Sequence, residues 1–184
     1  QNFRDNPVGL LGTIRCRRWH LGGKCVLLGD AAHAVVPFHG QGMNAAMESA
    51  RALAAHLAST PDDVADAFRR FETDRRPDTD AIARMALDNY IEMRSGVVDP
   101  DYVAQRTLAL ELERRHPTLL SPRYNMVMFS TMPYAEALRR AARQSEIIAD
   151  ALADPDLDVD SLVRTLPPLP ELDPLADPQA LSVS

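Results

Sequence analysis

Glycine is distributed very unevenly in this chain, and the distribution limits what the chain can fold into. Seven of the eight glycines lie within the first 42 residues, and the eighth is Gly96. Glycine collects where the backbone turns sharply or lies close to a ligand. The sequence after residue 42 is instead rich in alanine, leucine and arginine, which favour helices. We therefore predict a short glycine-rich α/β region followed by a long, mostly α-helical region.

The glycine-rich region contains two apolar runs. Residues 8–14, VGLLGTI, are compatible with a strand or an extended edge. Residues 24–28, KCVLL, are apolar on both faces and lie between Gly23 and Gly29, so we predict a buried strand of a mixed or parallel sheet. From Gly42 to about residue 58 we predict a helix whose apolar residues recur at helical spacing, namely Met43, Ala46, Met47, Ala50, Leu53, Ala54 and Leu57.

Prolines and capping residues divide the rest of the chain into helices. Thr60 is a suitable N-cap with Pro61 at the first helical position, and Pro77 should break the helix that they begin. Glycine is a common helix terminator, so Gly96 should end the next helix. The same signals predict helices over residues 61 to about 75, 79–94, 100–116 and 134–153.

The last part of the sequence, residues 154–184, has a different composition. It holds six of the fourteen prolines and seven acidic residues against one arginine. Such a segment buries too little apolar surface to offset the entropy of ordering. We predict a disordered or loosely packed tail that is dispensable for any chemistry.

Charge and hydropathy exclude several classes of protein. The net charge of −6 and the pI near 5.3 argue against a nucleic-acid partner. No run of about 18 apolar residues exists, and the first residues show no secretory signal, so we expect no membrane association. The two cysteines, Cys16 and Cys25, are too few and too far apart for a disulfide framework. We therefore expect a reduced, cytoplasmic setting.

The most informative motif is GDAAHAVVP, residues 29–37. A carboxylate directly after a strand, as Asp30 is in our interpretation, lies where open α/β sheets bind ligands, and it suits sugar or polyol hydroxyls. The alternative is that Asp30 caps the turn and His33 packs against it. A metal site from Asp30, His33 and His39 matches no usual ligand spacing, so we expect none.

The next motif, PFHGQGMN, leads directly into the predicted helix at Gly42. Free N–H groups at Gly42, Met43 and Asn44, together with the positive end of the helix dipole, form an anion site. The run from Gly40 to Ala45 also fits the dinucleotide pattern GxGxxA. That pattern needs a strand directly before it, and Pro37 stands there, so we reject it.

Together these two motifs resemble those of the flavin-dependent aromatic hydroxylases. The resemblance implies a Rossmann-like FAD-binding parent fold, with FAD as cofactor and NADPH as co-substrate. It implies that Asp30 contacts the ribityl chain and that the isoalloxazine meets the backbone of Gly42, Met43 and Asn44. It further implies that the substrate side of the ring is lined by Pro37, Phe38 and His39. The flavin carries the chemistry, so no catalytic side chain is expected.

Two later segments, NYIEMR (residues 89–94) and YNMVMFSTMPYAEA (residues 124–137), resemble the members of this family that hydroxylate L-kynurenine. The resemblance implies that Asn89 and Tyr124 contact the amino-acid end of the substrate, and that Met93 and Phe38 line its aromatic part. From the residues alone, Asn89 and Met93 share one helix face. A hydrogen-bonded core asparagine and a packed core at Tyr124 are the alternatives.

The resemblance also implies a domain organisation. Residues 1–58 would end an FAD-binding domain, residues 59–153 would form a helical domain that covers the substrate, and residues 154–184 would be the tail. The chain would be the C-terminal portion of the enzyme, inactive without the N-terminal FAD-binding portion, and a homodimer is left open. Another flavin aromatic hydroxylase and a non-catalytic helical fragment with a vestigial flavin loop are the rival hypotheses.

Overall fold

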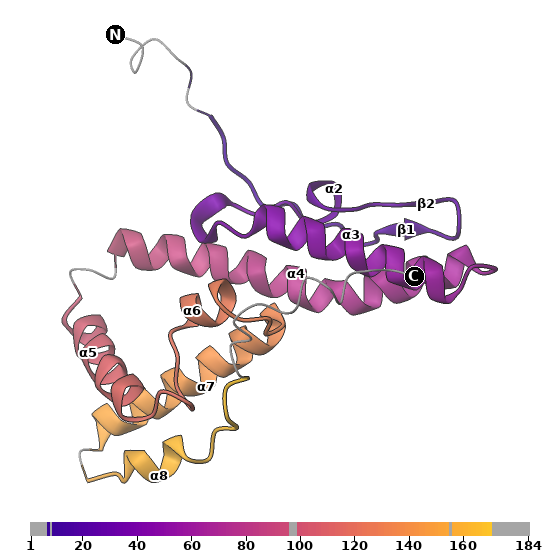
Figure 1. Cartoon of the computed structure of the whole chain (residues 1–184). Helices are drawn as coiled ribbons and strands as arrows, with labels where there is room; N and C mark the ends of the chain where they lie inside the picture. Colours follow the sequence, from indigo (N-terminus) through magenta and orange to yellow (C-terminus); the bar gives the residue numbers. More distant parts are fainter. Residues whose placement is uncertain (1–6, 8, 96–98, 155, 171–184) are drawn as a thin grey trace. The chain divides into compact units, whose positions relative to one another are not determined.

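The computed structural model describes residues 7, 9–95, 99–154 and 156–170, and these fall into two compact units, residues 1–91 and 92–184 (Figure 1). The division lies within a long helix, whereas the functional boundary at residue 58 stays a prediction. The described elements are mostly helices, as predicted. In chain order they are β1 (His20–Leu21), β2 (Cys25–Val26), α2 (Asp30–His33), the 3-10 helix η1 (Pro37–His39), α3 (Gly42–Ser59), α4 (Val64–Ser95), α5 (Pro100–Arg115), α6 (Arg123–Met128), α7 (Tyr134–Ala153) and α8 (Val159–Val163).

The predicted buried strand at residues 24–28 is wrong in length, pairing and burial. Only Cys25–Val26 is a strand, and it pairs with β1 in antiparallel register, with His20 opposite Val26. Leu27 and Leu28 are exposed. The loop that joins the strands contains Gly22 at φ 54°, a backbone conformation that closes a local hairpin. Residues 9–14 form no strand, although the Ile14 N–H donates to the Ala34 carbonyl.

The core of the first unit is built around Trp19, which no motif in the sequence singles out. Its ring centroid lies 5.2 Å from that of His33 and 5.6 Å from that of Phe71. The guanidinium of Arg76 lies 5.0 Å from the indole centroid, in cation–π range. These contacts join the segment before β1 to α2 and α4.

Helix α3 forms as predicted, but it buries a different face. Met43 and Met47 are 72% and 67% exposed, while Ala45 and Ser49 are buried. Small side chains allow α3 to approach its neighbours closely. A Cβ added to Gly29 would lie 3.3 Å from the Cβ of Ala46. Close packing and the polar contacts of Ser49, described below, therefore decide which face is buried.

Helix α4 runs for 32 residues through Pro77, so the predicted break into two helices is wrong. Proline removes one N–H and disturbs the carbonyl four residues earlier. Here Pro77 and Thr73 both lie on the exposed face, where water can satisfy that carbonyl. Buried Phe71, Ile82 and Met85 hold the helix on the core on both sides of the proline. Gly96, the predicted helix end, lies outside the described residues.

The start of α4 also differs from the prediction. Thr60 is the C-cap of α3, and its N–H and hydroxyl both donate to the carbonyl of His56. Asp63 instead caps α4, because its carboxylate accepts the N–H of Asp66 at 2.9 Å. The turn takes three residues more than the sequence suggested.

In the second unit, the proline-bounded helices are confirmed. Asp99 caps α5 by accepting the Asp101 N–H at 3.0 Å, and Pro133 directly precedes α7. A buried cluster joins α5, the following loop, α7 and the segment around α8. Its members are Leu112, Leu120, Ile147, Val163 and Leu166.

The prediction of a disordered tail is therefore wrong for residues 156–170. Asp158 caps α8 by accepting from the Ser161 N–H and hydroxyl, and Asp160 contacts His116 and Arg115 at the end of α5. These contacts, together with the buried side chains of Val163 and Leu166, offset the ordering entropy that composition alone predicted to win. Residues 171–184 lie outside the described part of the chain.

Candidate functional site

The GD motif forms a tight turn at the start of α2. Gly29 has φ 57°, in the left-handed region, and its carbonyl accepts the N–H groups of Ala32 and His33, each at 2.9 Å. Glycine suits this position because a side chain would be strained and would press on Ala46. Asp30 follows with an exposed side chain. The turn therefore presents a carboxylate to solvent while its backbone is fixed on α3.

His33 belongs to the packing of the unit. Its imidazole Nε2 lies 3.1 Å from the hydroxyl of buried Ser49 on α3. Burial lowers the pKa of His33, so the neutral form is favoured in the folded chain. Among the described residues, no group of three or more His, Cys, Asp or Glu side chains could hold a metal ion.

Arg75 of α4 is the residue around the motif that sequence reasoning missed. Its guanidinium donates to the hydroxyl of Ser49 at 3.5 Å, to Glu48 at 2.9 Å and to Asp78 at 3.2 Å. The side chain is buried, and buried arginines need such partners. Arg75, Ser49 and His33 form a polar chain that fixes α2 against α3 and α4. The run RRPD gives the charges, but no pattern in it indicates which arginine turns inward.

The loop between α2 and α3 ends in an open helix N-terminus. Gly40 has φ 70°, and its N–H donates to the Pro37 carbonyl at 3.0 Å, which turns the chain into α3. Gln41 occupies the N-cap without a side-chain capping bond, because its buried side-chain oxygen accepts from the Asn44 amide at 2.7 Å. The N–H groups of residues 42–44 have no partner within the helix. The anion site at these residues stays a prediction.

Two residues of α4 hold the loop that precedes α3. The Asn89 amide donates to the carbonyl of Phe38 at 2.5 Å. The rings of Phe38 and Tyr90 lie 4.7 Å apart at an interplanar angle of 33°. The first unit thus brings residues 37–39 and Asn89 together. Asn89 is hydrogen-bonded, as in the alternative interpretation, but it is half-buried and not part of the core.

The other two predicted substrate residues belong to the second unit. Tyr124 lies on α6 and is 48% exposed, so the packed-core interpretation is wrong for it, although Met126 and Val127 are buried. Met93 lies near the end of α4 with an exposed side chain. An ion pair between Arg123 and Glu92, at 2.9 Å, links the start of α6 to this end of α4.

Comparison with known proteins identifies the relatives of this chain. A family model described as an FAD binding domain matches residues 11–86. A kynurenine 3-monooxygenase of Stenotrophomonas maltophilia (strain K279a) is 52% identical over 155 residues, covering 84% of this chain and 34% of that protein. The kynurenine 3-monooxygenase of Xanthomonas oryzae pv. oryzae (strain PXO99A) is 51% identical, and that of Xanthomonas campestris pv. campestris (strain B100) is 50% identical. Each of these two matches spans 82% of this chain and 33% of the relative.

The chain thus spans about one third of the length of the curated relatives that it matches. Within the described residues, no helix combines the length and the apolar character needed to cross a membrane. The chain is similar to kynurenine 3-monooxygenases over more than four fifths of its length, and its residues 11–86 match an FAD binding domain.

Proposed function

We propose that this chain is the C-terminal part of an FAD-dependent monooxygenase that uses NADPH and O₂ to hydroxylate L-kynurenine to 3-hydroxykynurenine. The parent fold would be the Rossmann-like fold of the flavin aromatic hydroxylases, and the region with the GD turn and α3 would belong to it. The proposal is based on one main observation. The GD turn and the uncapped N-terminus of α3 both occur in the region that matches an FAD binding domain.

The residues of the first unit fit a flavin. The exposed carboxylate of Asp30 is available for hydroxyl groups of the ribityl chain. The N–H groups of Gly42, Met43 and Asn44 have no helical partners and suit the pyrimidine edge of the ring, which is electron-rich. When bound, FAD supplies the electron transfer and oxygen chemistry that amino-acid side chains cannot provide.

The protein's own contribution is binding, orientation and exclusion of water. Pro37, Phe38 and His39 would form the wall beside the substrate, and the hydrogen bond from Asn89 to Phe38 keeps that wall in place. Fixing an aromatic ring at the reacting position lowers the entropic part of the barrier, and excluding water from the site suppresses side reactions that consume NADPH without hydroxylating the substrate.

The polar end of L-kynurenine is assigned to Asn89 and Tyr124, and its aromatic part to Met93 and Phe38. These assignments rest on the family resemblance and on the chemistry of the side chains. An amide and a phenol can both hydrogen-bond to a carboxylate or an ammonium group. A cytoplasmic location and a homodimer stay predictions.

The test uses the complete enzyme that contains this chain, assayed for NADPH oxidation and for 3-hydroxykynurenine formation. L-kynurenine is compared with 4-hydroxybenzoate, a phenol without an amino-acid end. We expect product from L-kynurenine alone. Turnover of the phenol in its place would favour the generic aromatic hydroxylase, and a protein that binds no FAD would favour the non-catalytic fragment.

The Asp30→Ala variant tests the cofactor assignment separately from activity. We expect a lower FAD content after gel filtration, with unchanged far-UV circular dichroism, because the side chain is exposed. Asp62→Ala is the matched control, since Asp62 is an exposed carboxylate in the turn before α4. Equal FAD retention in both variants would refute the role of Asp30.

A further inference from the structure

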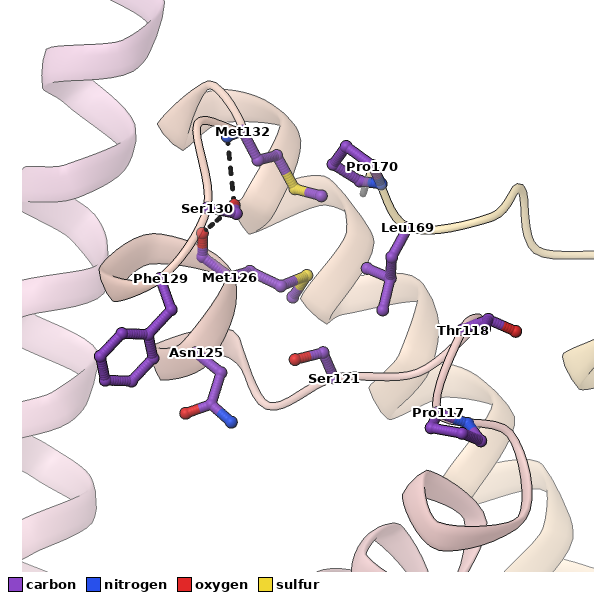
Figure 2. Close-up of a pocket in the computed structure, with 10 residues that line it drawn as sticks. All are labelled: Pro117, Thr118, Ser121, Asn125, Met126, Phe129, Ser130, Met132, Leu169 and Pro170. Carbon is purple, nitrogen blue, oxygen red and sulfur yellow. Dashed lines mark hydrogen bonds between the residues drawn. The ribbon is translucent and has the colours of Figure 1, made fainter. Parts of the chain in front are cut away.

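The second unit contains a cavity of about 570 Å³ that the proposed function does not use (Figure 2). Its walls come from the loop after α5, from α6 and the loop that follows it, and from the end of the described chain. The lining residues are Pro117, Thr118, Ser121, Asn125, Met126, Phe129, Ser130, Met132, Leu169 and Pro170. None of the ten residues assigned above to FAD or to kynurenine is among them. The volume is typical of a small-molecule site, about 300–1,000 Å³.

One wall depends on the segment that composition predicted to be disordered. The N–H of Leu169 donates to the carbonyl of Thr118 at 2.8 Å. The guanidinium of buried Arg140 on α7 donates to the carbonyls of Leu119 and Pro167, at 2.6 and 2.5 Å. These bonds fasten residues 167–169 to the loop after α5. The cavity is therefore bounded by anchored backbone.

The chemistry of the lining defines the ligand. None of the described residues that line the cavity carries a charge. A carboxylate or ammonium group would find no counter-ion in this lining and would lose hydration against the buried Met126 and Met132, so an uncharged ligand is favoured. Met126 and Met132 are buried, and Figure 2 shows their side chains directed to the same space as that of Leu169. Methionine sulfurs are polarizable and contact aromatic rings favourably.

The polar groups of the lining differ in availability. The hydroxyl of Ser130 already bonds within the loop, to the Met126 carbonyl and the Met132 N–H. Ser121 and Asn125 line the opposite side, and their hydroxyl and amide groups can donate and accept hydrogen bonds. An amide and a hydroxyl suit a neutral group that also donates and accepts, such as a carboxamide.

We propose that this cavity binds an uncharged aromatic molecule, with its ring against Met126, Met132 and Leu169 and a neutral carboxamide-type group at Ser121 and Asn125. This site is additional to the proposed flavin and kynurenine functions and does not depend on them. A zwitterionic amino acid such as kynurenine is a poor ligand for it, because the lining offers no charged partner.

The test is an NMR titration of the complete protein that contains this chain, labelled with ¹³C at its methionine methyl groups. The probe is 1-naphthamide, and 1-naphthoate is the charged analogue of the same shape. We expect saturable shifts at Met126 and Met132 with the amide, no shift at Met43 or Met85, and affinity for the carboxylate lower by roughly tenfold or more. Equal affinity for the two probes, or similar shifts at all methionines, would overturn the proposal.

Two variants locate the binding. Leu169→Trp should fill the cavity and abolish the shifts, whereas Thr165→Trp, at an exposed position outside the lining, should leave them unchanged. Asn125→Leu should reduce the preference for the amide over the carboxylate while keeping the ring contacts. Binding that persists in Leu169→Trp would show that 1-naphthamide binds elsewhere, and the proposal would then be wrong.

Discussion

Replacing Leu166 by alanine tests whether the segment around α8 is part of the folded core. Leu166 is 6% exposed and belongs to the cluster with Leu112, Leu120, Ile147 and Val163. The change removes three carbon atoms, worth about 2.4 kcal/mol at roughly 0.8 kcal/mol each. The cavity left behind adds to this, and such substitutions cost about 2–5 kcal/mol in all.

The assay is urea unfolding followed by far-UV circular dichroism. With a slope of about 2 kcal/mol per molar urea, a loss of about 2.4 kcal/mol lowers the midpoint by about 1 M. Leu152→Ala on α7 is the matched control, because Leu152 is 43% exposed and should lose well under about 1 kcal/mol. Equal midpoints for the two variants would mean that the α8 segment adds nothing to the core. The prediction of a disordered tail would then hold for this segment as well.

Three further predictions concern α4, the buried histidine and the substrate. Pro77→Ala should raise the free energy of unfolding by about 1–3 kcal/mol, because it restores a helical N–H on an exposed face; a lower thermal midpoint would contradict this. Burial lowers the pKa of His33 below its ordinary value of 6.5, so the unfolded chain binds more protons than the folded chain below that pH. The free energy of unfolding should therefore fall as the pH decreases below 6.5. In urea titrations at several pH values, the free energy of unfolding of His33→Gln should depend less on pH than that of the unchanged chain. Asn89→Ala and Tyr124→Phe in the complete enzyme should each remove a hydrogen bond to a charged group, worth about 1.5–3 kcal/mol. KM for kynurenine should therefore rise roughly ten- to a hundredfold in each variant, with normal FAD content. An unchanged KM in both variants would indicate that these residues have a structural role only.

The candidate site was largely accessible from the sequence because its signals are local. The run GDAAHAVVP and the following PFHGQGMN predict a turn and a helix N-terminus, and both depend on residues within a few positions of one another. Gly29 and Gly40 show the positive φ angles that such turns need. The partner of Asn89 was not accessible, because Phe38 is 51 residues away in the chain. Arg75 was missed for the same reason, since its role depends on Glu48 and Ser49 of another helix.

What the sequence alone determined was the set of helices that carry their own boundaries. Asp99-Pro100 and Pro133 fixed α5 and α7, because a cap or a proline acts on the adjacent turn whatever surrounds it. Tertiary structure decided the rest. It carried α4 through Pro77, buried the Ser49 face of α3 and ordered α8. In each case contacts between segments far apart in the chain outweighed a local preference of about 1–3 kcal/mol, and no local pattern records those contacts.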